Sequence, residues 1–234
     1  MGKDLKVSPI EALFFDLDDT LLDYPLSEGR ALDETLSLFS PPWSREEFLS
    51  VYHGNNLALW RGLERGEVDF DRLRTERFTK TLEELGSPGI DPLLFAALYE
   101  ESLGRQVDTL PGAEMVIERL SRRYPMALIT NGISSIQRSR LARSPWSRYF
   151  SQVVISEEVG VVKPDPAILK PALESLNLEP SRVLFIGDSV LSDMACAERA
   201  GMPFAWFTPR PTEEPPNARY LFRFGRLEEL LSRL

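Results

Sequence analysis

The sequence predicts an α/β protein, with a doubly wound parallel sheet and an all-helical domain inserted into it. Three observations lead to this fold class. Short apolar runs are continuous rather than alternating, as in strands that are buried on both faces of a parallel sheet. Helical patterns separate the later runs from one another. The interval between the first run and the second, about 110 residues, is far too long for an ordinary crossover connection.

Five apolar runs are the expected strands of this sheet. They are ALFF (12–15), MALIT (126–130), VVI (153–155), RVLFIG (182–187) and FAWF (204–207). Because strands and helices alternate after the first run, the sheet is expected to be parallel.

Helices are expected between and after these strands. Their ranges are 111–124, 134–144, 165–178 and 191–202, the last of which closes on Gly201. The proline-rich stretch 208–216 predicts a surface loop, and 226–234 predicts a short C-terminal helix.

The long interval after the first strand has helical composition. One pattern closes on Gly86, where a glycine favours the end of a helix. Another offers Asp91 as N-cap, Pro92 at the first helical position and Gly104 as the stop. We therefore predict an inserted helical domain.

The domain boundaries follow from the same patterns. Residues 23–107 are predicted as the helical domain, and residues 1–22 and 108–234 as the α/β domain. A chain of 234 residues is long enough for a core domain with a smaller second one.

The composition limits the classes of partner. A formal net charge of −9 argues against a nucleic-acid polymer or an anionic membrane and leaves a small anionic substrate open. No stretch approaches the roughly 18 apolar residues of a membrane span, and residues 1–15 lack the long apolar run of a secretory signal, so we expect neither feature. The single cysteine, Cys196, fits a reducing compartment as a buried small residue. We expect a cytoplasmic monomer or small homo-oligomer.

Polar side chains follow the carboxyl ends of the expected strands, where open α/β sheets bind ligands. They are Asp16, Asp18 and Thr20 after the first strand, Thr130 and Asn131 at the second, Lys163 after the third, and Asp188 and Asp193 after the fourth. Hard carboxylate oxygens with open coordination positions suit Mg²⁺, which often binds substrate phosphate too. The sequence therefore predicts a metal site at this edge.

Four segments contain these polar residues: FFDLDDTLLDY (14–24), ALITNG (127–132), VGVVKPDP (159–166) and VLFIGDSVLSDMACAERAGM (183–202). In this order they resemble the four motifs of the haloacid-dehalogenase-like (HAD) phosphohydrolases. The resemblance covers nearly the whole chain and meets no departure at a catalytic position. It implies a Rossmann-like core with a helical cap inserted after the first motif.

This resemblance implies a role for each motif residue. Asp16 is then the nucleophile that forms an aspartyl-phosphate, and Asp18 protonates the leaving alcohol before it activates water. Thr130 and the Asn131 backbone hold phosphate oxygens, while Lys163 offsets negative charge. The implied Mg²⁺ ligands are the Asp16 side chain, the Asp18 backbone carbonyl and Asp188, with Asp193 acting directly or through water.

Two segments, 56–78 and 155–166, are similar to a bacterial group of nucleoside 5′-monophosphate phosphatases in this superfamily, which prefers pyrimidine and non-standard nucleotides. The similarity implies Asn56 and Arg77 as substrate contacts, since the cap closes over the leaving group. Each has an ordinary structural alternative, Asn56 as an amide that bridges helices and Arg77 as a surface cation.

Other functions remain open from the motifs alone. The substrate could be a sugar phosphate or phosphoglycolate, and phosphomutases share the motifs. Phospho-accepting receiver domains also combine aspartates, a hydroxyl and a lysine, but they are shorter and have no cap. A binding module without activity on this fold is the third alternative, and the intact set of catalytic residues disfavours it.

Overall fold

The computed structural model describes residues 9–87, 89–210, 212–216 and 218–234. The chain divides into two compact units. The core unit takes in the chain up to Tyr24 together with Val107–Ser134 and Leu141–Leu234. The helical unit consists of Pro25–Gln106 and Ser135–Arg140.

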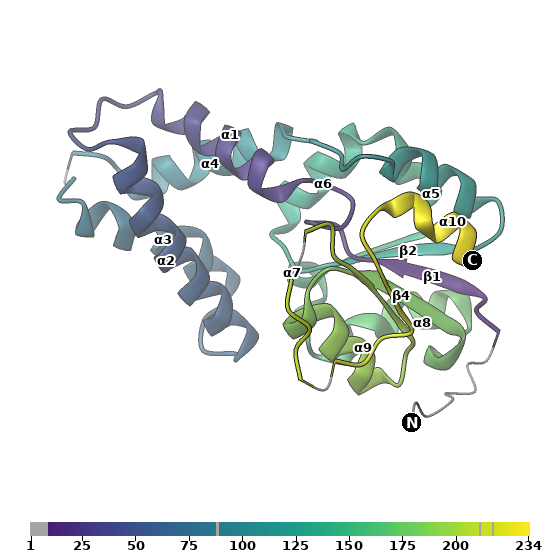
Figure 1. Ribbon diagram of the computed structural model, residues 1–234. Coiled ribbons are helices and arrows are strands. Elements are labelled where there is room, and N and C mark those ends of the chain that lie inside the picture. The colour runs from purple at the N-terminus through teal and green to yellow at the C-terminus, as the bar shows by residue number, and fades with distance from the viewer. Residues whose placement is uncertain (1–8, 88, 211, 217) are drawn as a thin grey trace. The chain divides into compact units, whose positions relative to one another are not determined.

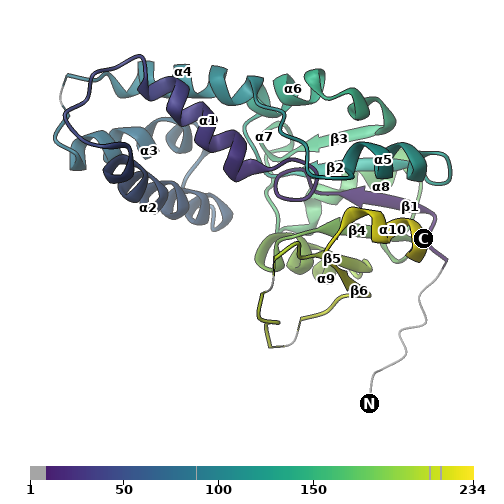
Figure 2. The same cartoon turned by 45° about the horizontal axis from the view of Figure 1, so that its top comes forward.

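The core unit contains a six-stranded sheet with the order β3-β2-β1-β4-β5-β6, in which every neighbouring pair is parallel (Figures 1 and 2). The predicted doubly wound parallel sheet is confirmed. Its strands are β1 (Ala12–Phe15), β2 (Met126–Thr130), β3 (Gln152–Ile155), β4 (Val183–Gly187), β5 (Phe204–Phe207) and β6 (Phe222–Phe224).

Strand β6 was not predicted from the sequence. It has three residues, next to the proline-rich stretch, and its first two are only half-buried. A run this short gives no alternation that could be told from a loop.

Alternate residues of β1 enter opposite apolar layers, which explains why the strand is apolar throughout. Leu13 and Phe15 pack with residues of helices α5 (Ala113–Ser121) and α10 (Leu230–Arg233). Ala12 and Phe14 pack with residues of α8 (Lys170–Leu176) and α9 (Ala195–Ala200). In Figure 1, α5 and α10 lie above the sheet, and α8 and α9 lie below it.

Several expected core helices are divided or shortened. Pro166 and Pro171 each stand in the first turn of a short helix, so the predicted helix at 165–178 becomes a 3₁₀ turn followed by α8. The predicted helix at 191–202 becomes a π-helical turn, Val190–Met194, followed by α9. The remaining helical segments are α6 (Ser134–Arg143), α7 (Ser156–Val159) and the 3₁₀ turns Pro145–Tyr149, Pro166–Leu169, Pro180–Arg182 and Leu227–Glu229.

The inserted region is helical, as predicted. Its helices are α1 (Tyr24–Leu36), α2 (Arg45–Glu64), α3 (Phe70–Glu84) and α4 (Pro92–Arg105). Asp91 caps α4 by accepting a hydrogen bond from the Leu93 N–H, and Gly86 has φ of +64° just after α3.

Gly104 does not end a helix, because α4 continues to Arg105. A Cβ at Gly104 would lie 3.1 Å from Ser139, so the glycine allows a close approach inside the helical unit. Close packing against Ser139, rather than the end of a helix, therefore explains the glycine at position 104.

Aromatic rings fill the interior of the helical unit. Phe48, Tyr52, Phe78, Phe95 and Tyr99 are all fully buried and contact one another through stacked, tilted and edge-to-face pairs. Such clusters supply most of the stabilising burial of a small helical domain. Among the helices of the described residues, none combines the length and apolar character that crossing a bilayer requires.

Candidate active site

The neighbouring strands β1 and β4 bring Asp16 and Asp188 to the same edge of the sheet. Phe15 is in register with Ile186, and the Asp16 N–H donates to the Ile186 carbonyl at 2.9 Å. Asp193 joins them from the π-helical turn that follows β4. Each of these three carboxylates offers an oxygen within 4.8 Å of the others.

Lys163 is the cation of this cluster. Its Nζ donates to Asp16 Oδ1 at 2.5 Å, to Asp193 Oδ1 at 2.7 Å and to the Ile129 carbonyl at 3.0 Å. The side chain is only 2% exposed. Because each partner is buried as well, the ammonium is fixed in position and directed at the carboxylates.

The side chain of Asn131 holds Lys163 in place. Its Oδ1 accepts from the Lys163 N–H at 2.8 Å and its Nδ2 donates to the Lys163 carbonyl at 3.0 Å. This reciprocal pair engages both polar atoms of the amide and ties the loop after β2 to Lys163. Thr130, which is 1% exposed, directly precedes Asn131 at the end of β2.

The loop after β2 is also tied to the chain after β3. The Gly132 N–H donates to Ser156 Oγ at 2.9 Å, and Ser156 is fully buried. Glu157 accepts from the Ser134 N–H at 2.6 Å, at the start of α6. The residues that would hold phosphate therefore sit on a loop with fixed geometry.

The loop after β1 is compact. The Leu21 and Leu22 N–H groups both donate to the Leu17 carbonyl, at 2.8 and 3.0 Å, and Asp19 has φ of +61°. Thr20 Oγ1 donates to Asp188 Oδ1 at 3.3 Å. Asp18 is half-buried on this loop, and its side chain is not part of the carboxylate triad.

Asp193 owes its position to a glycine and a backbone donor. Its Oδ2 accepts from the Ser189 N–H at 3.1 Å. A Cβ at Gly187 would collide with the Asp193 carboxylate, so the last residue of β4 has to be glycine for this side chain to fit.

The carboxylates have unusual protonation equilibria. Burial raises the pKa of Asp16 to about 7 against the opposing attraction of Lys163. Burial also raises the pKa of Asp188 to about 9, and the charges of Asp193 and Asp16 add to the rise. Burial lowers the pKa of Lys163, but attraction to Asp16 and Asp193 outweighs it, so the net pKa lies above the ordinary value.

These shifts fit a site for a divalent cation. Two buried carboxylates, Asp16 and Asp193, and the half-buried Asp188 share one lysine, which leaves negative charge that the lysine does not balance when all three are ionised. Oxygen donors at this spacing are the ligands that Mg²⁺ prefers. Asp16, Asp188 and Asp193 could hold the ion.

The sequence did not predict the ion pair of Asp193 with Lys163 or the hydrogen bond that Ser156 accepts from Gly132. Asp193 was expected to act on the metal alone, because spacing along one strand end carries no information about a lysine from another loop. Nothing in the sequence around Ser156 distinguishes it from a surface serine; its contact depends on the pairing of β2 with β3.

The two substrate contacts expected in the helical unit have different environments. Arg77 is 1% exposed, with its guanidinium carbon 5.0 Å from the ring centroids of both Phe78 and Tyr99. It is therefore not a surface cation. Its Nη1 donates to Asn56 Oδ1 at 3.5 Å, and Asn56 itself is half-buried.

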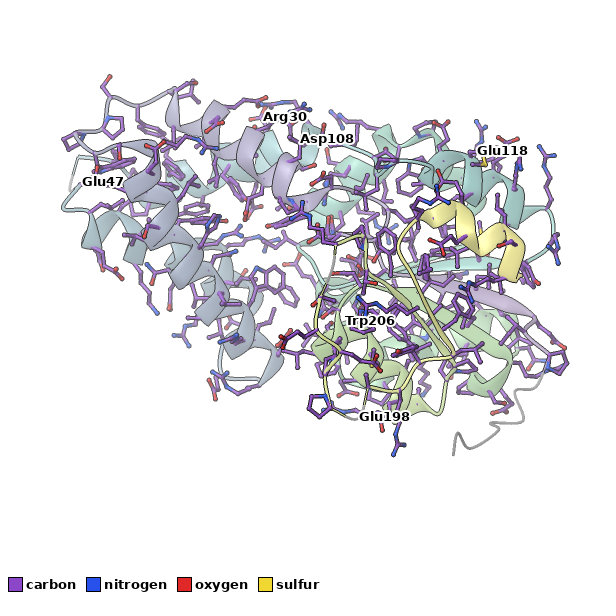
Figure 3. The ribbon with its side chains drawn as sticks, in the orientation of Figure 1. Arg30, Glu47, Asp108, Glu118, Glu198 and Trp206 are labelled. Atoms are coloured by element: carbon purple, nitrogen blue, oxygen red, sulfur yellow. The ribbon has the colours of Figure 1, made fainter. Side chains whose placement is uncertain are left out.

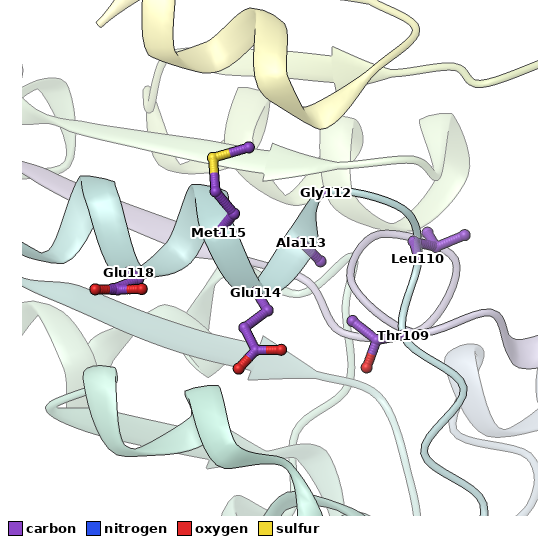
Figure 4. A pocket seen from close by; sticks show the side chains of 7 residues that line it. All are labelled: Thr109, Leu110, Gly112, Ala113, Glu114, Met115 and Glu118. Carbon is purple, nitrogen blue, oxygen red and sulfur yellow. The ribbon is translucent and has the colours of Figure 1, made fainter.

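A separate shallow pocket of about 470 Å³ lies at the start of α5 in the core unit (Figure 4). Its charged lining residues, Glu114 and Glu118, are both acidic, which disfavours a phosphate ester there. The pocket contains none of the site residues predicted from the sequence.

Comparisons with known proteins agree with this geometry. The family model of the haloacid dehalogenase-like hydrolases matches residues 10–201. The pyrimidine 5′-nucleotidase PynA of Streptococcus pneumoniae is 32% identical over 94% of this chain and 92% of its own. The pyrimidine 5′-nucleotidase YjjG of Escherichia coli is 31% identical over 93% and 95%. The phosphoserine phosphatase of Thermus thermophilus is 32% identical over 94% and 98%.

Solved structures include a likeness over the whole length. The crystal structure of the HAD-hydrolase YfnB from Bacillus subtilis, bound to magnesium, has a TM-score of 0.87 at 28% identity. The alignment covers 97% of this chain and 99% of that one.

A parallel sheet with paired aspartates, a buried lysine and a threonine at its carboxyl edge, in a chain that also carries an inserted helical unit, matches a class of phosphate-ester hydrolases. The chain belongs to the haloacid dehalogenase-like hydrolase family and is a phosphatase.

Proposed function

We propose that this phosphatase depends on Mg²⁺, acts through a phosphoryl group on Asp16 and hydrolyses nucleoside 5′-monophosphates, pyrimidine or non-standard. The observation that carries the catalytic part is the contact of Lys163 Nζ with both Asp16 and Asp193, inside a carboxylate cluster at the sheet edge. The similarity to two pyrimidine 5′-nucleotidases supports the substrate.

In the first step the Asp16 carboxylate attacks phosphorus. A bond forms between an Asp16 oxygen and phosphorus as the bond to the leaving oxygen breaks. Asp18 gives its proton to that oxygen, so the product leaves as an alcohol. Lys163 favours the ionised form of Asp16, because its attraction opposes the rise in the Asp16 pKa that burial causes.

In the second step water removes the phosphoryl group from Asp16. Asp18, now a carboxylate, takes a proton from the water whose oxygen attacks phosphorus. The bond between Asp16 and phosphorus breaks, inorganic phosphate leaves, and both aspartates return to their starting states. Thr130 and the Asn131 backbone hold the phosphoryl oxygens through both steps.

Mg²⁺ would be held by the Asp16 side chain, the Asp18 backbone carbonyl and Asp188, with Asp193 acting directly or through water. When bound, the ion supplies the positive charge that keeps these carboxylates ionised and offsets charge on the phosphoryl group. These oxygen ligands would come from the end of β1, the end of β4 and, for Asp193, the π-helical turn that follows β4.

For the leaving group we propose Asn56 as the contact and Arg77 as the residue that orients it. Arg77 is buried among aromatic rings, whereas Asn56 is half-buried and lies at hydrogen-bond distance from it. An amide can serve a pyrimidine well, because it donates to and accepts from the ring edge.

The test is phosphate release with Mg²⁺ from a panel of nucleoside monophosphates, phosphoserine, phosphoglycolate, sugar phosphates and p-nitrophenyl phosphate. The ranking is by kcat/KM. Asn56→Ala should lower kcat/KM for the preferred nucleotide about tenfold, the value of one hydrogen bond, and leave p-nitrophenyl phosphate unchanged.

Asn55→Ala is the matched control. Asn55 is the preceding residue on α2, and its amide donates to Thr81 and Glu84 within the helical unit. The Asn55→Ala variant should rank the substrates by kcat/KM in the same order as the unmodified protein. Equal effects of the two variants, or a lead for a small phosphate over every nucleotide, would contradict the nucleotide assignment.

A small organic phosphate is the second candidate substrate. The phosphoserine phosphatase of Thermus thermophilus matches this chain at the same identity as PynA does. A lead for phosphoserine in the panel would keep the roles of the catalytic residues and change only the leaving group.

A further inference from the structure

Trp206 on β5 contacts the backbone of Asp188 on the neighbouring strand end. Its indole Nε1–H donates to the Asp188 carbonyl oxygen at 2.9 Å. Trp206 is in register with Gly187, the last residue of β4, so strand pairing delivers the indole to this carbonyl. The ring, labelled in Figure 3, is 2% exposed.

The contact lies where the sheet no longer orients the chain. Strand β4 ends at Gly187, and the π-helical turn begins at Val190. The Asp188 peptide group lies between these two elements and accepts the indole N–H. Thr20 holds the carboxylate of the same residue at 3.3 Å. Asp188 is thus held at both its backbone and its side chain.

Arg223 on β6 holds the Trp206 ring and the segment beside it. Its guanidinium carbon lies 4.8 Å from the centroid of the indole. Its Nε donates to Thr208 Oγ1 at 2.7 Å and its Nη2 to the Thr212 carbonyl at 3.2 Å. One side chain therefore contacts the indole ring, Thr208 and Thr212.

We propose that Trp206 is a positioning residue for Asp188 as a ligand of Mg²⁺, and that Arg223 keeps the Trp206 ring in place. The inference rests on the proposed function only in taking Asp188 as a metal ligand. Outer partners that orient metal ligands typically contribute about 10- to 100-fold to metal affinity. A hydrogen bond to the ligand's backbone belongs at the low end of that range.

Trp206→Phe removes the donor and keeps an aromatic ring. Trp146→Phe is the matched control, since Trp146 is 1% exposed in the same unit and its indole N–H meets no hydrogen-bond acceptor within the described residues. The readout is the Kd for Mg²⁺ by calorimetry without substrate, together with the Mg²⁺ dependence of activity.

Trp206→Phe should weaken Mg²⁺ binding about tenfold, and kcat should recover at saturating Mg²⁺. Trp146→Phe should bind Mg²⁺ as the unmodified protein does. Arg223→Met, a second variant that leaves the indole in place, should weaken Mg²⁺ binding roughly threefold through loss of the cation–π contact.

Asp188→Asn separates this inference from the proposed function. If the unmodified protein binds Mg²⁺ and Asp188→Asn does not, Asp188 is a ligand. Mg²⁺ affinity left unchanged by Trp206→Phe and Arg223→Met, or lowered equally by Trp146→Phe, would then overturn the inference alone. If Asp188→Asn binds Mg²⁺ normally, the metal assignment in the proposed function fails first.

Discussion

Lys163 is the residue on which the charges of the site depend. Its ammonium bonds to Asp16, Asp193 and the Ile129 carbonyl, and Asn131 fixes its backbone. Burying an ammonium costs free energy that only close partners offset, and here those partners are carboxylates that would otherwise repel each other. The lysine therefore stabilises the fold, and in the proposed mechanism the same contacts prepare Asp16 as the nucleophile.

We predict that Lys163→Met abolishes turnover and lowers the free energy of unfolding of the metal-free protein by roughly 3 kcal/mol. The physical reason is that Asp16 and Asp193 lose the cation between them while they stay buried. Kinetic assay with Mg²⁺ and urea unfolding in EDTA measure the two effects.

Lys170→Met is the control for that variant. Lys170 is an exposed lysine on α8, 3.7 Å from Glu174 one turn further on. Its loss should change stability by less than about 0.5 kcal/mol and leave turnover intact. A Lys163→Met protein with normal kcat would remove Lys163 from the mechanism.

At the scale of the elements, two parallel strand pairs bring the site together. The pairing of β1 with β4 places Asp16 beside Asp188, and the pairing of β2 with β3 places the Thr130 loop beside Ser156. A parallel sheet collects the carboxyl ends of its strands at one edge. Residues far apart in the chain therefore become neighbours.

The sequence predicts where Asp16 and Asp188 lie, but it does not predict the contacts of Ser156 and Trp206. Asp16 and Asp188 follow apolar runs directly, so placing the strands places these residues. Ser156 and Trp206 act through strands adjacent to their own, and their contacts depend on register, which one sequence does not reveal. Gly104 was misinterpreted because a glycine at a close contact resembles a glycine at a helix end.

Ser156→Ala tests the link between the loops after β2 and β3. Without the bond from the Gly132 N–H, that donor is buried without an acceptor, and the loop that carries Thr130 and Asn131 loosens. We expect KM for the phosphate ester to rise several-fold, about three- to tenfold, with a smaller change in kcat and a stability loss of roughly 1–2 kcal/mol.

Ser151→Ala is the control at the other end of the same strands. Ser151 Oγ donates to the Met126 carbonyl at 3.0 Å, just before β3, at the edge of the sheet opposite the site. The Ser151→Ala variant should keep the KM of the unmodified protein for the phosphate ester. If both serine variants raised KM alike, the cause would be a general loosening of the sheet rather than a change in the loop that carries Thr130 and Asn131.

For the whole molecule, the proposed binding of Mg²⁺ would be linked to folding stability through the carboxylates of Asp16 and Asp188. The metal-free protein holds protons on Asp16 and Asp188 up to pKa values of about 7 and about 9, whereas an unfolded chain releases them near pH 4. The folded state therefore binds more protons than the unfolded state across this window. Its stability falls as pH rises through the window.

We predict that EDTA-treated protein melts at a lower temperature at about pH 8 than at about pH 5, and that Mg²⁺ raises the melting temperature more at the higher pH. At 100 times its Kd, Mg²⁺ should contribute about 2.7 kcal/mol, or roughly 5–10 °C. EDTA should also stop turnover.

Scanning calorimetry of the metal-free and Mg²⁺-loaded protein checks the stability prediction, with Asp188→Asn as the control. The variant lacks one titrating carboxylate, so its pH dependence should be shallower. Full activity in excess EDTA, or a metal-free stability that rises over this pH range, would contradict the linkage.

Phosphorylation of Asp16 is the step on which the other proposed roles depend, and intact-protein mass spectrometry after acid quench detects it. The measurement uses Asp18→Asn with p-nitrophenyl phosphate, because nitrophenolate leaves without a proton while the slowed attack of water lets the intermediate accumulate. We expect a burst of nitrophenol with one added phosphoryl group on Asp16, and no adduct in the Asp16→Asn, Asp18→Asn double variant. A burst without any adduct, or an adduct that persists in the double variant, would rule out Asp16 as the nucleophile.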